Sequence, residues 1–233
     1  MAFIIAEIGI NWDGDLNLAK EMIEKSKDAG ANAVKFQAFN FDIVKNHPQN
    51  QRLMKSSISK ENIEQIVNIT KEEEIEFFCT PMYSEGVNLL EPYVNRYKIR
   101  EIDGRELLKD RVSEIFDRIL KTKKEVIISS NTSPKKSKFY NKDNIKWLYC
   151  VPKYPTKIEE LDFSIMKDFD GYSNHTPEIL IPIVASVLGS EIIEVHVTLD
   201  KKMDFIDNNV SLDFSDFKEM IRQIRIVEKL RKK

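Results

Sequence analysis

The sequence has 233 residues, of which 42% are hydrophobic and 32% are charged, and its formal net charge is −2 at pH 7. This balance excludes a dedicated nucleic-acid-binding protein, because such proteins need a surplus of lysine and arginine to displace counterions from phosphates. Disorder is excluded because the sequence has enough apolar residues, among them 13 phenylalanines, to form a hydrophobic core. A membrane protein is excluded because no run approaches the ~20 apolar residues that span a bilayer.

The N-terminus and the cysteines indicate a cytoplasmic protein. The opening MAFIIAEIGINWDGD has no basic segment and turns acidic at once, which is not typical of a signal peptide. Cys79 and Cys150 form no CxxC motif and no disulfide framework, so we expect reduced, buried thiols.

Short apolar segments rich in strand-forming residues recur along the chain. They lie at residues 3–8, 31–37, 75–79, 96–99, 125–129, 145–150, 171–173 and 191–197. Several of them, such as FIIAEI and EVIISS, are apolar at consecutive positions. This pattern is typical of parallel strands that are covered on both faces.

Segments with helical periodicity separate most of these strands. The first predicted helix has Asp15 as its N-cap and Gly30 just after its end, and the last has Asp213 as its N-cap. The polar segment 131–144 lacks a helical period, so we expect the fifth helix to be short or absent.

Eight strands alternating with helices predict an α/β fold, a compact (β/α)8 TIM barrel that forms one domain over residues 1–233. The alternative is an open, doubly wound sheet. The barrel is favoured because eight units fit the length and no GxGxxG motif follows the first strand.

Polar side chains end most of the predicted strands, and in a barrel the chemistry lies at this end. These side chains are Glu7, Lys35, Gln37, Thr80, Lys98, Ser129, Tyr154, Ser173, His175, Glu194 and His196. Two lysines and several hydroxyl groups at one mouth would suit an anionic substrate, especially a phosphate. Taken alone, Lys35 or Lys98 has an alternative interpretation: its apolar stem packs on the strand and its ammonium group reaches the solvent.

Two of the three histidines, His175 and His196, follow or end the last two strands. Neighbouring strands lie about 4.8 Å apart, so both imidazoles can face one ion. Glu7 on the adjoining first strand would complete a set suited to Mn, Fe, Zn or Co. The alternative is that each histidine is a core residue. Glu194 would support the metal or pair with a lysine, while His47 is expected at the surface.

Six segments carry a resemblance to a known family. The run IIAEIGINWDGDLNLAKEMIEKSKDAGANAVKFQAF resembles the opening of sialic acid synthases, with the patterns AEIG-x-NHNG and GAD-x-VKFQ. The segments FFCTPMYSEGVNLL, YKIREIDGRELL, LYCVPKYPT, GYSNHT and IIEVHVTLDKKMDFIDNNVSLD are similar to that family's later motifs. They occur in the same order and reach about Asp213.

The resemblance implies a TIM barrel that condenses phosphoenolpyruvate with the aldehyde of an N-acylated amino sugar, releasing phosphate and forming a nonulosonic acid. His175 and His196 would hold Mn or Mg, and Glu7 would position or deprotonate the water that adds to C2 of the enolpyruvate. Phosphoenolpyruvate would contact Lys35, Lys98, Thr80, Ser129 and Ser173, beside Glu194. The sugar would contact Gln37, Tyr154 and Asp207.

Several positions depart from the family pattern. Asn11-Trp12 replaces Asn-His, Pro152 replaces a serine or asparagine, and Glu101 replaces a phosphate-binding serine. The sequence also ends after the last helix, whereas usual members continue into an antifreeze-like domain that supplies an arginine to the sugar of a partner. We therefore expect a sugar pocket that is open, rebuilt or completed by another protein.

Three functions are left open by these departures: the synthase itself, a divergent barrel that binds an anionic sugar or phosphate without condensing it, and an unrelated metal-dependent aldolase or isomerase. The second includes a partner subunit of such a synthase. A homo-oligomer is also left open, and no nucleic-acid or membrane partner is expected.

Overall fold

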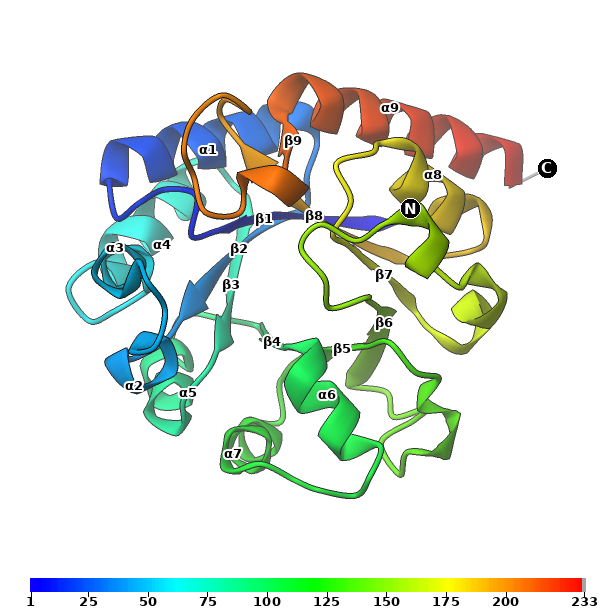
Figure 1. Cartoon of the computed structure of the whole chain (residues 1–233), viewed down its shortest axis with the longest axis horizontal. Helices are drawn as coiled ribbons and strands as arrows, with labels where there is room; N and C mark the ends of the chain where they lie inside the picture. Colours follow the sequence, from blue (N-terminus) through cyan, green and yellow to red (C-terminus); the bar gives the residue numbers. More distant parts are fainter. Residues whose placement is uncertain (232–233) are drawn as a thin grey trace.

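The structure, a computed structural model, describes residues 1–231 and is a closed barrel of parallel strands (Figure 1). Each of strands β1 to β8 pairs with the next, and β8 pairs with β1 to close the barrel. The strands are β1 (Phe3–Gly9), β2 (Ala33–Ala38), β3 (Glu76–Pro81), β4 (Arg96–Ile99), β5 (Glu125–Ser130), β6 (Ile145–Tyr149), β7 (Gly171–Asn174) and β8 (Ile192–Thr198). The predicted TIM barrel is confirmed, and the predicted strand ends agree within two residues.

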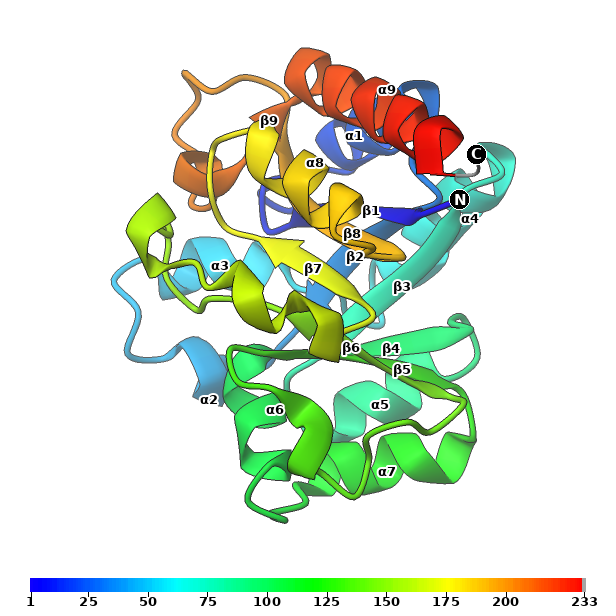
Figure 2. The same ribbon diagram turned by 90° about the vertical axis from the view of Figure 1, so that its right-hand side faces the viewer.

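Helices surround the barrel on the outside, as Figures 1 and 2 show. They are α1 (Leu16–Ala29), α2 (Phe41–Val44), α3 (Asn50–Ser56), α4 (Ile63–Glu72), α5 (Ser84–Leu90), α6 (Glu101–Leu107), α7 (Glu114–Thr122), α8 (Leu180–Val187) and α9 (Phe214–Arg231). Residues 131–144 contain only the 3-10 turn η1 (Pro134–Lys136), as expected. The alternation of strands and helices predicts an α-helix between β6 and β7. The structure has two 3-10 segments there instead, η2 (Ile158–Glu160) and η3 (Phe163–Asp168).

Local sequence signals account for the ends of the helices. The Asp15 carboxylate accepts a hydrogen bond from the Asn17 amide, and Gly30 adopts the left-handed conformation (φ 97°). The Asp213 carboxylate accepts from the Asp216 amide in the first turn of α9. All three predicted capping positions are therefore confirmed. A short strand not predicted from the sequence, β9 (Leu212–Asp213), pairs with the end of β8.

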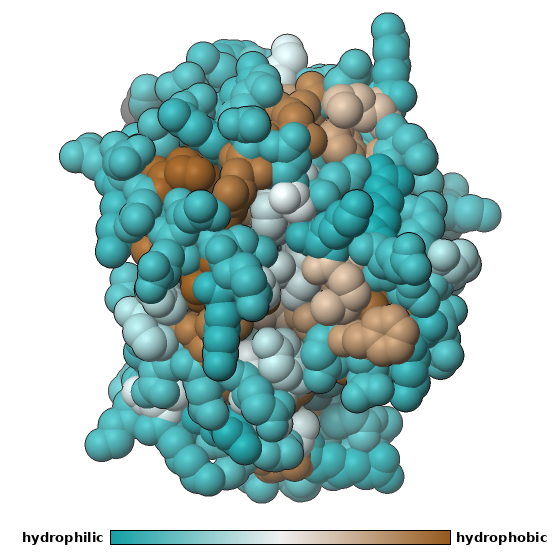
Figure 3. Space-filling model, turned by 90° about the vertical axis from the view of Figure 1, so that its left-hand side faces the viewer, coloured by the Kyte–Doolittle hydropathy of each residue, from teal (hydrophilic) through white to brown (hydrophobic). Residues whose placement is uncertain are grey.

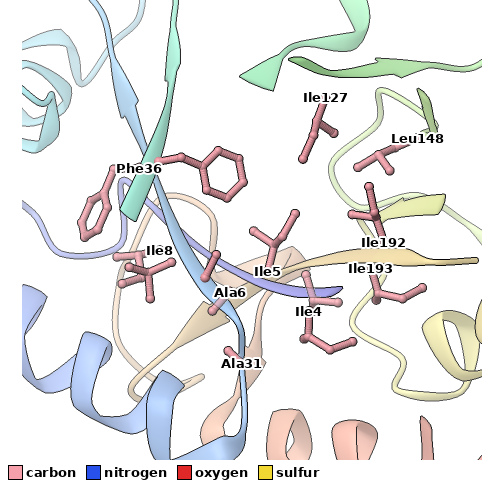
Figure 4. Close-up of a cluster of buried hydrophobic side chains, with 14 of the residues drawn as sticks. Ile4, Ile5, Ala6, Ile8, Ala31, Phe36, Ile127, Leu148, Ile192 and Ile193 are labelled. Atoms are coloured by element: carbon pink, nitrogen blue, oxygen red, sulfur yellow. The ribbon is translucent and has the colours of Figure 1, made fainter. Parts of the chain in front are cut away.

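The barrel interior is filled in layers. At the amino ends of the strands, Arg96 binds Glu76 (2.8 Å) and Glu125, with its guanidinium 4.4 Å from the centre of the Phe3 ring. Above this layer lie apolar side chains (Figure 4), which include Ile5, Ile127, Leu148 and Ile192. Because these lower layers fill the interior, a substrate can enter the barrel only at the carboxyl ends of the strands, where polar side chains of the described residues point inward.

Helix α6 lies unusually close to strand β5. A Cβ atom on Gly104 would lie 2.1 Å from the carbonyl oxygen of Ser129, so no residue with a side chain fits there without displacement. This contact brings the first residue of α6 to the mouth of the barrel.

The surface shown in Figure 3 is mostly hydrophilic, with small apolar patches between the charged groups. Within residues 1–231, no helix combines the length and the apolar character needed to cross a membrane.

Candidate active site

The carboxyl ends of the strands surround a cavity of about 270 Å³. Every site residue predicted from the sequence lines this cavity: Glu7, Lys35, Gln37, Thr80, Lys98, Ser129, Tyr154, Ser173, His175, Glu194, His196 and Asp207. A larger cavity, of about 610 Å³, lies at the opposite end. Several of its charged side chains already pair with other side chains, Arg96 with Glu125, Lys146 with Asp170 and Glu228 with Arg225. The smaller cavity, at the carboxyl ends of the strands, is therefore the better candidate.

Two carboxylates and two ammonium groups meet at the base of the cavity. Lys35 Nζ lies 2.8 Å from Glu7 Oε2 and 3.8 Å from Glu194 Oε2, and Lys98 Nζ lies 3.2 Å from Glu194 Oε1. None of these four residues is more than 4% exposed. Since β4 and β8 lie on opposite walls, the Lys98–Glu194 pair crosses the interior of the barrel. We call these four residues the ion quartet.

Neutral polar groups complete the contacts of the ion quartet. Lys98 Nζ donates to Ser129 Oγ (2.7 Å), and Lys35 Nζ donates to Thr80 Oγ1 (3.2 Å). The carboxylates also accept hydrogen bonds, from Gln37 Nε2 to Glu7 (2.8 Å) and from Ser173 Oγ to Glu194 (2.8 Å). These residues hold the charged groups in fixed positions before any ligand binds.

The two carboxylates differ in their affinity for protons. Burial raises the pKa of Glu194, but Lys35 and Lys98 outweigh it and bring that pKa to about 2. Burial also raises the pKa of Glu7. Glu7 has one lysine neighbour, Lys35, whose charge is not enough to offset the effect of burial, so the pKa of Glu7 stays above its usual value. Neighbouring acids whose pKa values are driven apart are typical of a fixed charge beside a proton-transferring group. Glu7 is therefore the group suited to exchange a proton.

The two histidines stand side by side on the opposite part of the cavity, with ring centres 5.4 Å apart. His175 Nδ1 lies 2.8 Å from the Val151 carbonyl oxygen, so it carries the proton and leaves a lone pair on Nε2. That lone pair accepts from the Tyr154 hydroxyl at 2.9 Å. His196 Nδ1 is buried without a hydrogen-bond partner and lies 3.6 Å from Asp207 Oδ2.

Burial lowers the pKa of His175, and burial together with the neighbouring His175 and Lys35 lowers that of His196. Both imidazoles are therefore neutral near pH 7, which is the form that binds metals. Burial disfavours the charged form of an acid as well, so it raises the pKa of Asp207, to about 7; the neighbouring Glu7 carboxylate adds to this rise.

Comparison with known proteins places this barrel in a family. Residues 22–233 match the NeuB family. The chain belongs to the NeuB family. Its relatives include an uncharacterised protein from Methanocaldococcus jannaschii, 33% identical over 98% of this chain and 71% of the relative. Another is the N,N'-diacetyllegionaminic acid synthase of Campylobacter jejuni, 31% identical over 97% of this chain and 76% of the relative.

A crystal structure of N-acetylneuraminic acid synthetase from Leptospira borgpetersenii serovar Hardjo-bovis in complex with citrate is also similar. The two structures share 28% identity with a TM-score of 0.85, covering 98% of this chain and 84% of the other. The resemblance to sialic acid synthases drawn from the sequence motifs is thus confirmed at the level of family and fold.

The donor atoms of this NeuB barrel fit a divalent ion in part. The unpartnered His196 Nδ1 and the exchangeable Nε2 of His175 are suitable ligands. The sequence-based idea that Glu7 joins them is wrong, because Glu7 contacts Lys35 and Gln37 instead. Within residues 1–231, no three acidic, histidine or cysteine side chains form a ready-made metal cage. An ion here would need additional ligands from substrate or water.

Two more charged residues, Glu101 and Arg100, line the cavity of this NeuB barrel. Glu101 is 4% exposed; one carboxylate oxygen accepts from Arg105 Nη2 (2.7 Å), whereas the other is buried without a partner. Arg100 also lines the cavity, and its Nε donates to Asp103 (2.8 Å). Arg100 was not among the predicted residues, although its place directly after strand β4 was a usable signal.

The raised pKa of Asp207 predicts a dependence of stability on pH. The folded protein, with a pKa of about 7, holds this proton more tightly than the unfolded chain, with 3.8. The stabilisation is therefore complete below pH 3.8 and is lost as the pH rises through 7. We expect the unfolding free energy of the wild type, relative to Asp207→Asn, to fall by on the order of 3–4 kcal/mol between pH 4 and pH 8. Urea unfolding with EDTA present measures this difference, and a constant difference would contradict it.

Proposed function

We propose that this chain condenses phosphoenolpyruvate with the open-chain aldehyde of an N-acylated amino sugar, forming a nonulosonic acid and releasing phosphate. The observation that carries the proposal is the ion quartet facing two neutral histidines across one cavity. The names of its relatives, an N,N'-diacetyllegionaminic acid synthase and an N-acetylneuraminic acid synthetase, support the same class of reaction.

Phosphoenolpyruvate would bind over the lysine side of the cavity. An ammonium group has three donors, and Lys98 directs two of them to Ser129 and Glu194. Its third donor, with the hydroxyl groups of Thr80 and Ser173, can take oxygens of the phosphate and carboxylate. Because the quartet has two positive and two negative members, the ligand's charge must be met mainly by short, directed hydrogen bonds.

The reaction joins C3 of phosphoenolpyruvate to the aldehyde carbon, while water adds at C2. The C2–O bond to phosphate then breaks, which leaves a ketone at C2. Of the two protons of the water, one ends on the former aldehyde oxygen, which becomes a hydroxyl group, and the other leaves with the phosphate. In our proposal Glu7 takes the proton of the attacking water, a role that suits its raised pKa. Glu194 stays ionised and holds both lysines in place. Gln37, Tyr154 and Asp207 contact the sugar at the other end of the cavity.

We propose that His175 and His196 hold a divalent ion, Mn or Mg, which would act as a Lewis acid toward the aldehyde oxygen when bound. The Tyr154 hydroxyl occupies the lone pair of His175 that such an ion needs. The Tyr154 hydroxyl would therefore have to move aside when the ion binds, while the Val151 carbonyl keeps the His175 imidazole in the required tautomer.

This arrangement predicts opposite effects of two changes on metal affinity. The double change His175→Ala with His196→Ala should abolish Mn binding in calorimetry. Tyr154→Phe should strengthen it about fivefold, because no hydrogen bond of roughly 1 kcal/mol need be broken. His47→Ala is the control, since that histidine is exposed and does not line the cavity. Stoichiometric Mn binding by the double variant would contradict the assignment.

The synthase activity itself is tested by phosphate release from phosphoenolpyruvate with Mn and a panel of N-acylated amino sugars. Lys98→Met should raise the KM for phosphoenolpyruvate about tenfold to a hundredfold, because a charge-assisted contact of roughly 1.5–3 kcal/mol is lost. Lys146→Met is the matched control, since Lys146 is on strand β6 and lines the cavity at the opposite end of the barrel. Absence of sugar-dependent phosphate release by the wild type would contradict the proposed reaction.

A barrel that binds its ligand without condensing it is the second candidate, and Glu101 is the observation that favours it. Glu101 lines the same cavity as Lys98 and Ser129, and one of its oxygens is buried without a partner. A carboxylate at this place repels a phosphate. Such a residue suits a ligand that presents a hydrogen-bond donor at this end.

Glu101→Gln should therefore strengthen the binding of phosphoenolpyruvate, by about tenfold, because a like charge disappears and Arg105 loses its ionic partner. Isothermal titration measures the change, and Glu85→Gln on the exposed surface of α5 is the control. Unchanged or weaker binding by Glu101→Gln would contradict this repulsion between the carboxylate and the phosphate.

A further inference from the structure

The loop between β8 and α9 places Asp207 over the ends of the strands, and specific contacts hold this loop in position. Within residues 199–211 the regular structure is one 3-10 turn, η4 (Asn208–Val210). Yet Asp207 lies 3.6 Å from His196 and lines the cavity. A loop of this kind needs specific contacts to keep a side chain in one place.

Asn11, in the loop after β1, supplies those contacts. It is fully buried (0% exposed), and its Oδ1 accepts from the backbone amide of Asp207 at 3.2 Å. Its Nδ2 donates to the Val197 carbonyl (2.9 Å) and to Ser211 Oγ (3.0 Å). Ser211 Oγ in turn donates to the Asp207 carbonyl at 2.7 Å. Both backbone polar groups of Asp207 are thus tied, through Asn11, to the strand residue next to His196.

A second set of contacts holds the same loop from outside. Arg52 binds Asp13 (2.6 Å) and Asp204 (3.3 Å), and Ile206 packs on the apolar cluster that includes Ile10 and Leu53. The Asp204 partner is almost fully exposed, so that ion pair contributes little. The buried hydrogen bonds of Asn11 are stronger, because the low dielectric of the interior strengthens them and no solvent competes.

We propose that Asn11 is a positioning residue that fixes Asp207 against His196 at the acceptor end of the cavity. Asn11 does not line the cavity; it acts through the backbone of residue 207. The assignment of this end to the acceptor rests on the proposed function, whereas the fixing of the loop does not.

Hydrogen exchange tests the fixing of the loop without any assay of activity. In Asn11→Ala, the amides of residues 207, 210 and 211 should exchange at least tenfold faster than in the wild type, while strands β1 to β8 keep their protection. Asn62→Ala is the matched control. Like Asn11, Asn62 accepts a hydrogen bond from a backbone amide (Ser59) and donates one to a backbone carbonyl (Ser57), but these residues do not belong to the loop that carries Asp207. Unchanged exchange at residue 207 in Asn11→Ala would overturn the proposal.

Steady-state kinetics then separate positioning from general damage. Asn11→Ala should raise the KM of the acceptor sugar about tenfold and leave that of phosphoenolpyruvate within twofold. Ser211→Ala, a milder change that keeps the Asn11–Val197 bond, should act in the same direction, and the double variant should be no worse than Asn11→Ala. An equal rise of both KM values would overturn the positioning role. If the wild type proves inactive, the proposed function fails, and the exchange experiment alone decides the role of Asn11.

Discussion

Burying two carboxylates and two ammonium groups inside one barrel costs several kcal/mol per ion, and the mutual attraction of the ion quartet offsets this cost only while all four members are in place. Removing one partner leaves an uncompensated charge, which typically destabilises a protein by about 3–5 kcal/mol. The quartet draws its members from β1, β2, β4 and β8, so it couples the two strands that close the barrel, β1 and β8, with the opposite wall. The filled apolar and arginine layers below it keep the charged layer at the carboxyl ends.

The uneven arrangement of contacts within the quartet gives the cavity two different ends. Glu194 contacts both lysines and stays ionised, whereas Glu7 contacts one lysine and holds its proton more tightly. Across the cavity, His175 and His196 are neutral and stand beside Asp207. One end therefore offers charge for anions, and the other offers lone pairs and a titratable acid. A synthase that joins an anionic donor to a polyhydroxy aldehyde needs both kinds of end.

The barrel and most site residues could be predicted from the sequence for one physical reason. Parallel strands covered on both faces leave consecutive apolar runs, and the polar residue that ends each run, such as Glu7 or Ser129, lies at the same rim. The pairing of Glu194 with a lysine was one of the two roles expected for it, and the structure shows Glu194 beside both Lys98 and Lys35. The contact of the Tyr154 hydroxyl with Nε2 of His175 could not be predicted, because it depends on how the loop after β6 folds over the mouth rather than on a local pattern.

Asn11 shows the same limit more sharply. Its partners, Val197, Asp207 and Ser211, are about two hundred residues away in sequence, and an asparagine in a polar loop is expected to stabilise a local turn. Arg100 was missed for a different reason, since it stands one residue beyond the strand that positions it and carries no resemblance to the family motif.

The close approach of α6 to β5 links the outer layer of the barrel to the chemistry of its mouth. Gly104 has no side chain, and this absence sets how deeply the helix sits and therefore where Glu101, three residues earlier, meets the cavity. A single methyl group at position 104 would push the helix away from the Ser129 carbonyl and carry the Glu101 carboxylate outward with it. The charge presented to a ligand can thus be altered during evolution by a change in backbone spacing, with every residue of the cavity wall left as it is.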